Sequence, residues 1–376
     1  SSSVQHVGPE KIMLVVMPFE NLGSSDDEYF AMGITEEISN HLASIKELGV
    51  ISRKSAERYA TTDKTTGQIG CELGVQYVLD GTIRWARDGE HPSRVRVTPE
   101  LVRVEDDTRL WSNVYDRVVE DVFEIQSNIA NEVVKQLGLA VLERNVAGSE
   151  AQPTDNLEAY HAFLRGRYFS GLPHFTRGDM LKAIENYSRA IELDPSFPIA
   201  YAKLSEAHAT LYYYWEDRTE ERREQAKTAV EIAFSLRPDL PEVRLARGRY
   251  YLRVEGDVDQ ALAEFALAAR DLPESAEVCE AKGDGYRQQG KWLKAIDQYE
   301  QAIRLNPYTT SPLVEMSISC WLCRRYPEAV EAANKAIAIA PDLSWPYLSK
   351  GLAYLSWRGS SEEARKAFEV IPTGHD

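Results

Sequence analysis

Three consecutive acidic residues, Asp26, Asp27 and Glu28, follow an apolar run near the start of the 376-residue chain. Clustered carboxylates can bind a divalent cation or share a proton in acid–base catalysis, provided that further ligands converge on them. The seven histidines are scattered, and no His-x-x-x-His or Asp-x-Asp-x-Asp spacing joins them. Acids behind Ser24 and Ser25 are also typical of a helix start, because the positive helix end favours them. We therefore predict a helix start here, with no catalytic and no metal-binding residue.

Two other segments contain residue types that could form a reactive site. Cys320 and Cys323 lie in CWLC, the spacing of a redox pair or of half a zinc site, but no second ligand pair accompanies them. The segment GQIGCELG, with glycines at 67, 70 and 74, lacks the lysine and the spacing of a phosphate-binding loop. We predict two half-buried thiols in the first segment, a short helix in the second, and no cofactor for either.

The composition argues against nucleic acid and membrane as partners. The chain has 43 Lys and Arg against 59 Asp and Glu, a formal net charge of −16, and so lacks the basic excess that phosphate binding uses. No stretch of this sequence approaches the roughly 20 apolar residues of a membrane span. Residues 1–10 are expected to be a disordered or trimmed end of the chain.

The elements that must position these residues differ between the two halves of the chain. In the first half, apolar runs, amphipathic segments and alternating strands succeed one another. The expected order is strand 12–19, helix 33–45, strand 49–55, short helix 66–74, meander strands 75–87, 93–104 and 107–117, and closing helix 121–139. This order predicts a small mixed-sheet α/β domain over 11–140, with helices on one side of the sheet. Residues 141–156 lose periodicity and are predicted as a linker.

The second half repeats itself. Prolines that follow similar helical segments are 43, 35, 34 and 34 residues apart, at Pro195, Pro238, Pro273, Pro307 and Pro341. A 34-residue period built from helix pairs is the tetratricopeptide signature. Residues 157–372 closely resemble that family, which implies an all-α solenoid of about six repeats, the last incomplete. Insertions of about five residues near 170–179 and nine near 212–224 are expected on turns between paired helices.

One repeat, at 276–307, shows why the pattern packs. Small residues at Gly283, Ala295 and Ala302 allow two antiparallel helices to approach closely, and Tyr299 fills the space between neighbouring pairs. The aromatic run LYYYW at 211–215 breaks the pattern, and we predict mixed roles for it, because neighbouring residues on a helix diverge by about 100°. Some of these side chains should enter the core and others remain available for a partner.

The first half of the chain also resembles a known family. The blocks at 15–45, 72–84, 94–117 and 121–134 look like the TolB amino-terminal-like (FlgO-like) domain, in that order. In bacteria this domain, followed by tetratricopeptide repeats, is commonly found behind a Ser/Thr kinase, an adenylate cyclase or a winged-helix regulator. The resemblance implies the non-catalytic sensory part of a signalling protein, with an effector domain and a membrane span upstream of residue 1. It carries no catalytic residues over.

A tetratricopeptide solenoid uses its first helices to line a groove for a peptide or protein partner. By register, we assign six residues to this groove: Arg249, Arg253, Asp284, Arg287, Ile318 and Trp321. The three arginines suggest an acidic segment or a terminal carboxylate as the ligand, and the alternative is that all six are solvated surface residues.

Three functional hypotheses follow. The first is a non-catalytic protein-interaction region of a bacterial signalling protein. The second is a structural or homo-oligomeric scaffold whose groove is filled by its own chain or by a second copy. The third, an enzyme with a site between the two domains, has no constellation of residues in this sequence to support it. The compartment stays open between the extracytoplasmic part of a membrane-anchored regulator and the cytoplasm.

Overall fold

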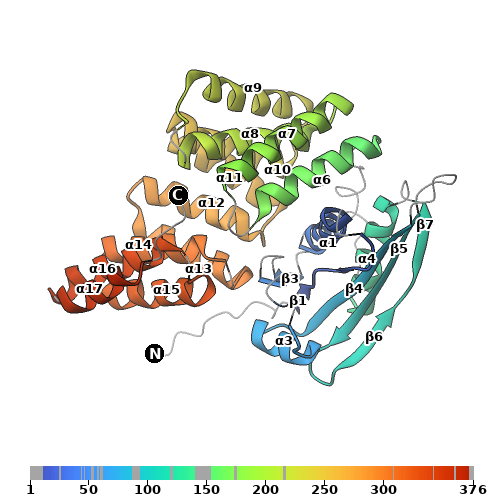
Figure 1. The fold of residues 1–376 in the computed structure, drawn as a ribbon, viewed down its shortest axis with the longest axis horizontal. Coiled ribbons are helices and arrows are strands. Elements are labelled where there is room, and N and C mark those ends of the chain that lie inside the picture. Colours follow the sequence, from blue (N-terminus) through green and yellow to red (C-terminus); the bar gives the residue numbers. More distant parts are fainter. Residues whose placement is uncertain are drawn as a thin grey trace, which may run out of the picture. The chain divides into compact units, whose positions relative to one another are not determined.

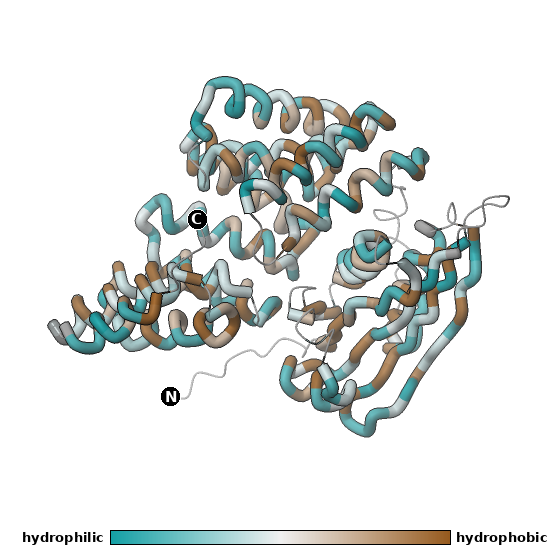
Figure 2. Tube along the Cα trace, viewed as in Figure 1, coloured by the Kyte–Doolittle hydropathy of each residue, from teal (hydrophilic) through white to brown (hydrophobic). Residues whose placement is uncertain are grey.

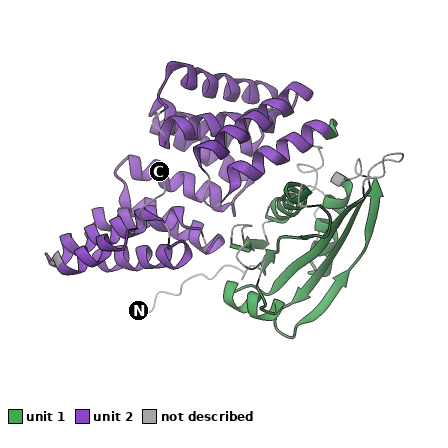
Figure 3. Ribbon diagram, in the orientation of Figure 1, with its two compact units in different colours: residues 1–157 green, residues 158–376 purple. Residues whose placement is uncertain are grey.

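The computed structural model describes residues 12–24, 27–43, 45, 47–51, 55–56, 59, 62–86, 94–118, 122–139, 154–172, 176–214, 217–307, 309–341, 343–359 and 361–371. The predicted chain end at 1–10 and most of the predicted linker at 141–156 lie outside these residues. The chain separates into two compact units, 1–157 and 158–376 (Figure 3). Each unit is described by itself.

Unit 1 is a mixed sheet with helices, as expected (Figure 1). Its strands are β1 (Ile12–Val16), β2 (Glu20–Asn21), β3 (Leu48–Ile51), β4 (Tyr77–Ala86), β5 (Arg94–Arg103), β6 (Thr108–Ser112) and β7 (Tyr115–Val118). Its helices are α1 (Glu28–Ala43), α3 (Thr66–Leu73) and α4 (Val122–Gln136). The sheet order is β3-β1-β4-β5-β6, with β1 parallel to both β3 and β4 and the later pairs antiparallel.

The predicted strand at 107–117 is divided in two, and a short strand, β2, was not expected. Strands β6 and β7 pair with opposite halves of β5, and the break at Asn113 and Val114 lies beside Pro99 of β5. Proline has no N–H to donate to a neighbouring strand, so the ladder is interrupted there. Helices α1 and α4 pack against each other, with α1 contacting β1 and α4 contacting β5, so they share one face of the sheet.

The acidic run does precede a helix, since α1 begins at Glu28. The Asn21 side chain donates hydrogen bonds to the Ser24 carbonyl and to Glu28, which fastens the turn before the helix. Asp27 is only 5% exposed, so it is more buried than an ordinary charge at a helix end. Asp26 lies outside the described residues. No His, Cys, Asp and Glu side chains within the described parts of the chain gather into a group that could hold a metal ion.

The glycine-containing segment forms the short helix α3, as predicted. Thr65 and Gln68 form a reciprocal capping box at its start, and Gly74 ends it in the left-handed conformation with φ of 67°. Glu72 accepts hydrogen bonds from Lys64 and Tyr59, so its carboxylate is engaged in contacts within the fold.

In the part of unit 2 that the structure describes, the helices form six pairs. The first helices are α6 (Leu157–Gly171), α8 (Pro198–Tyr214), α10 (Pro241–Tyr250) continued by the π-helical turn η3 (Tyr251–Glu255), α12 (Ala276–Gln288), α14 (Ser311–Leu322) and α16 (Ser344–Arg358). The second helices are α7 (Arg177–Leu193), α9 (Glu220–Leu236), α11 (Val258–Asp271), α13 (Trp292–Leu305), α15 (Tyr326–Ile339) and α17 (Ser361–Glu369). Apolar and polar residues are interspersed along these helices (Figure 2). Amphipathic periodicity is stronger in second helices such as α7, α11 and α13 than in the first helices α6 and α8.

Within each of four pairs, a glycine of the first helix contacts an aromatic ring of the second. A Cβ atom added at Gly283 would lie 2.5 Å from Cε1 of Tyr299, and one at Gly166 would lie 2.6 Å from Tyr187. The same contact joins Gly248 to Phe265 and Gly351 to Phe368. Ala295 and Ala302 are buried beside Tyr299, whose side chain is 0% exposed. The close approach predicted at Gly283 is therefore confirmed, but the contacts of Tyr299 with Gly283 and Asp284 lie within its own helix pair, whereas a place between neighbouring pairs was predicted.

The insertions do not fall on turns alone. Helices α8 and α9 have 17 residues each, against 13 and 14 in α12 and α13, so most of the nine extra residues lengthen helices. A longer helix satisfies the backbone hydrogen bonds of the added residues, which an irregular loop would not. The first insertion includes residues 173–175, which the structure does not describe.

The third repeat absorbs its one extra residue differently. Gly248 and Phe265 are 17 residues apart, whereas Gly283 and Tyr299 are 16 apart. The added residue widens one turn of the first helix into η3, which Gly256 ends with φ of 72°. Single-turn π-helical segments inside α-helices are frequent at functional sites. In this repeat the turn carries Arg253, one of the predicted groove residues.

Candidate functional site

The first helices of successive pairs contact one another through a row of polar side chains. On α12, Gly283 faces the second helix, and an adjoining side of α12 is left for contacts between pairs and for solvent. This side includes Glu280 and Asp284, at roughly 60° and 100° from Gly283 around the helix axis, and the repeat places an equivalent side on the other first helices. We call the side chains on that side of α8, α10, η3, α12, α14 and α16 the first-helix face. All six predicted groove residues belong to these helices.

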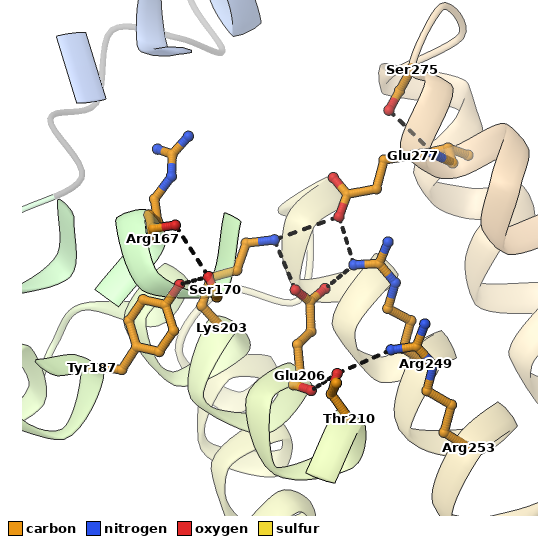
Figure 4. Close-up of polar contacts among 11 residues, drawn as sticks. Arg167, Ser170, Tyr187, Lys203, Glu206, Thr210, Arg249, Arg253, Ser275 and Glu277 are labelled. Atoms are coloured by element: carbon orange, nitrogen blue, oxygen red, sulfur yellow. Dashed lines mark hydrogen bonds and ion pairs between the residues drawn. The ribbon is translucent and has the colours of Figure 1, made fainter. Parts of the chain in front are cut away.

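At one part of this face, α8, α10 and α12 are joined by a charged network (Figure 4). Nη1 of Arg249 lies 2.8 Å from Oε1 of Glu206 and 2.6 Å from Oε1 of Glu277. Nζ of Lys203 lies 2.8 Å from Oε2 of Glu206 and 3.7 Å from Oε1 of Glu277. Burial alone would lower the pKa of Arg249, but the two carboxylates outweigh it and raise that pKa, so the guanidinium stays charged.

Arg253 has a different environment, one turn further along. Its Nη1 donates a 3.3 Å hydrogen bond to Oγ1 of Thr210, and its guanidinium lies 5.6 Å from the centroid of the Tyr214 ring. It forms no ion pair with any carboxylate that the structure describes. Arg253 is therefore the predicted groove arginine whose charge is least compensated by a direct contact.

Asp284 lies at the centre of a second charged cluster. The Tyr299 hydroxyl donates a 2.9 Å hydrogen bond to its Oδ1. Burial, followed by the neighbouring carboxylates of Glu280 and Glu315, raises the pKa of Asp284 to about 7. Nε of Arg287 forms an ion pair with Oε2 of Glu315 at 3.0 Å. This part of the face therefore changes its charge near neutral pH.

The remaining two predicted residues, on α14, are apolar. Ile318 is half-buried, and Trp321 packs partly against the core of α13, α15 and α16. Nε1 of Trp321 donates a 2.9 Å hydrogen bond to Oγ of Ser356 on α16. Trp321 thus has supporting contacts in the fold, and both side chains are partly exposed.

The structure brings the six predicted residues onto one face, but two of the three arginines already have internal partners. The sequence reasoning missed Glu206 and Glu277, which neutralise Arg249, and Glu315, which neutralises Arg287. A signal for Glu206 exists, because it precedes Arg249 by 43 residues, the same spacing that separates the first two repeat prolines.

Two other segments that the sequence analysis singled out, CWLC at 320–323 and the aromatic run that begins at Leu211, contribute to the packing of unit 2. Of the two thiols predicted to be half-buried, Cys323 is so, at the end of α14, whereas Cys320 is fully buried. Burial raises the pKa of the Cys320 thiol to about 11 and also raises that of Cys323, so both thiols are protonated at neutral pH. In the aromatic run, Leu211 is buried and Tyr212 packs on the core, whereas Tyr214 is 55% exposed beside Arg253. The predicted division between core and exposed side chains is confirmed for 211–214, and the partner-contact role of the exposed ones stays a prediction.

Unit 1 offers a hollow of about 610 Å³ between β7 and α4. Its lining residues are Tyr115, Asn128, Asn131, Glu132, Lys135, Gly138 and Leu139. They include no histidine, cysteine or serine that could form a nucleophile–base pair. Among the helices that the structure describes, none is long and apolar enough to cross a bilayer.

Comparison with known proteins identifies the repeats. Residues 171–211 match the family model described as TPR repeat, and residues 276–309 match the one described as tetratricopeptide repeat. The chain is 31% identical over 198 residues to "Putative adenylate cyclase 3" of Rhizobium meliloti (strain 1021), covering 52% of this chain and 32% of that protein. It is 26% identical over 183 residues to Superkiller complex protein 3 of Mus musculus, covering 47% and 11%. The chain thus spans about a third or less of these relatives' lengths.

Two solved structures are similar to part of the chain. PilW, a "widely conserved type IV pilus biogenesis factor", is 16% identical with a TM-score of 0.46, covering 56% of this chain and 91% of that chain. YrrB, "a TPR protein with an unusual peptide-binding site", is 18% identical with a TM-score of 0.38, covering 50% and 94%. The two family matches identify tetratricopeptide repeats at 171–211 and 276–309, and four helix pairs in the described part of unit 2 share the glycine–aromatic contact of such repeats.

Proposed function

We propose that this chain is a non-catalytic protein-interaction region, and that the first-helix face of unit 2 binds a segment of a partner protein. Arrays of this kind present their first helices as a binding surface. The observation that carries the proposal is the composition of this face, where half-exposed Ile318 and Trp321 adjoin charged side chains on α12. Buried aromatic anchors with a polar surround are typical of protein interfaces.

The signalling context belongs to the same proposal. The likeness of the first half to the TolB amino-terminal-like domain and the name of the bacterial relative both suggest that this region accompanies an effector domain. We propose that unit 1 is such a domain, with boundaries at 11–140, a linker at 141–156 and repeats at 157–372. The activity of a longer protein would then reside outside these residues.

A peptide-display selection against the full chain tests the binding proposal. Recovered peptides would be synthesised and titrated by fluorescence polarisation against wild type and two serine variants. Ile318→Ser alters the first-helix face, and Leu293→Ser alters a leucine of α13 that is 61% exposed. We expect Ile318→Ser to weaken binding about tenfold and Leu293→Ser to leave it unchanged, because only the first is in the contact. Equal binding by both variants would place the contact elsewhere.

A further inference from the structure

Four positions of the first-helix face recur at the 34-residue period, and their chemistry changes from repeat to repeat. They are charged in α12, mixed in α14 and apolar in α16. In the same order, the three sets are Glu277, Glu280, Asp284 and Arg287; Ser311, Val314, Ile318 and Trp321; Trp345, Leu348, Leu352 and Leu355. The face therefore passes from charged to apolar over three repeats.

The apolar end of this series is open to solvent. Trp345 and Leu355 are 63% and 47% exposed, and Leu322, next to Trp321, is 42% exposed. The apolar strip, as we call it, comprises Val314, Ile318, Trp321, Trp345, Leu348, Leu352 and Leu355. Its two helices are in contact, and the hydrogen bond from Trp321 to Ser356 joins them. Contiguous exposed apolar surface that borders on charged residues commonly marks a site for a protein partner.

The charged end of the series has one carboxylate in excess. Around Asp284, the carboxylates of Glu280, Asp284 and Glu315 face the guanidiniums of Arg253 and Arg287. Arg287 is paired with Glu315, and Arg253 contributes a second positive charge. With all five groups ionised, this cluster carries one net negative charge, which a cation from a partner would balance.

The protonation state of Asp284 determines whether this cluster carries its net negative charge. It is faced by Glu280 and Arg287 of its own helix, Arg253 of η3, Glu315 of α14, and the phenols of Tyr299 on α13 and Tyr214 on α8. Since its pKa is about 7, Asp284 holds a proton over part of the neutral range. A basic side chain beside it would favour the ionised form and so displace the proton.

We propose that the first-helix face binds a protein segment that carries one basic side chain and at least two apolar side chains. The basic side chain lies at the carboxylates of α12 and α14, and the apolar ones lie along the apolar strip. This inference rests on the proposed function and names the chemistry of its partner. Charge complementarity favours such a segment over a second copy of this chain, because the formal net charge of −16 makes two copies repel.

The packing of the repeats also sets the spacing in the partner. Packed helices lie about 8–10 Å apart, and an extended segment advances about 3.3 Å per residue. One first helix therefore corresponds to about three residues of an extended partner that crosses the helices. The expected motif has a basic residue, a first apolar residue about three positions away and a second about six positions away.

The probes are fluorescein-labelled nonapeptides titrated against the full chain by fluorescence polarisation. One set contains Lys-x-x-Leu-x-x-Phe, a second replaces Lys by Glu, a third replaces both apolar residues by Ser, and a fourth scrambles the first. Two variant pairs accompany wild type. Leu355→Ala is matched by Leu293→Ala on α13, and Asp284→Asn is matched by Asp297→Asn, whose side chain is exposed on α13.

We expect the Lys set to bind most tightly. Leu355→Ala should weaken it roughly fivefold, while Leu293→Ala has no effect, because only Leu355 lies on the strip. Asp284→Asn should abolish the preference for Lys over Glu without removing the preference for apolar residues. The Lys preference should grow about threefold between pH 6 and pH 8 as Asp284 ionises, and this growth should be absent in Asp284→Asn.

Three outcomes would overturn the inference. Tighter binding of the Glu set, or equal binding of the scrambled set, would contradict the assigned chemistry while leaving a peptide-binding function in place. A concentration-dependent dimer that Leu355→Ala dissociates would show that a second copy covers the strip. Absence of binding by every set would refute this partner chemistry, whereas peptides recovered in the display selection would still support the proposed function.

Discussion

The interior of each helix pair and the first-helix face are built from the same helices but hold different chemistry. In the interior, Gly283 and Ala302 lie against Tyr299, whose side chain is fully buried. On the face, Arg249 bridges Glu206 and Glu277, and Trp345 is 63% exposed. The interior is repeated in kind from pair to pair, whereas the face changes from one repeat to the next.

This difference indicates which substitutions should affect stability and which should affect binding. Close-packed interiors tolerate neither added nor removed volume, because neighbouring atoms have no space to move. A half-exposed face can change its residues at low cost in stability, since solvent compensates for lost contacts. The four predictions below measure that contrast, beginning with the interior.

The largest effect is expected for Gly283→Leu. A Cβ atom at this position would lie 2.5 Å from the Tyr299 ring, so the leucine forces α12 and α13 apart. We expect a loss of about 3 kcal/mol in the free energy of unfolding, measured by urea denaturation followed by circular dichroism. Gln288→Leu, at the exposed end of α12, is the control and should change stability little. Equal losses in both variants would contradict the close-packed contact.

Arg249→Ala should have the next largest effect. It leaves the carboxylates of Glu206 and Glu277 facing each other, with Lys203 as the remaining cation. Because Glu277 is 47% exposed, solvent screens part of this repulsion, and we expect a cost of about 2 kcal/mol in unfolding free energy. Arg304→Ala, an exposed arginine of α13, serves as the matched control. A stability like that of the control would mean that the network contributes little.

Asp284→Asn should reveal a pH-dependent contribution. Burial and then the neighbouring carboxylates raise the folded-state pKa of Asp284 to about 7, above that of an unfolded aspartate. Its protonated form therefore stabilises the fold at low pH, and this stability is lost as the pH rises through about 7. Between pH 6 and pH 8, wild type should lose about 1.4 kcal/mol relative to Asp284→Asn, measured by thermal unfolding. Parallel pH profiles of the two proteins would refute this.

The smallest effect on stability is expected for Leu355→Ala. Its side chain is 47% exposed on the apolar strip, so the change should alter the unfolding free energy by less than about 0.5 kcal/mol. Thermal unfolding of the two proteins would check this. A larger loss would show that the strip is part of the core, and the binding loss expected above would then need a structural explanation.

Much of the second half could be predicted because its signal is local and repeated. The period, the helix pairs and the contacts of Gly283 with Tyr299 all follow from small and aromatic residues at fixed spacing. The first half was less predictable. The break between β6 and β7 depends on Pro99 in a neighbouring strand, a contact that no pattern within 107–117 contains.

For the candidate site, register was enough to place Arg249, Asp284 and Trp321 on one face, because each residue's helix and turn follow from the repeat. Their charge states were not predictable. The partners of Arg249 precede it by 43 residues and follow it by 28, on first helices of two different pairs, and the lengthened helices of the second pair alter the spacing.

The sequence by itself determined that this protein has a 34-residue helical repeat and a preceding α/β region, because periodicity and composition are properties of the chain alone. Only the tertiary structure decided that Arg249 is neutralised, that Asp284 retains a proton near neutral pH and that Trp345 and Leu355 extend the same face. The physical reason is that Coulomb interactions and burial depend on distances between helices far apart in sequence, and the packing of successive pairs sets those distances.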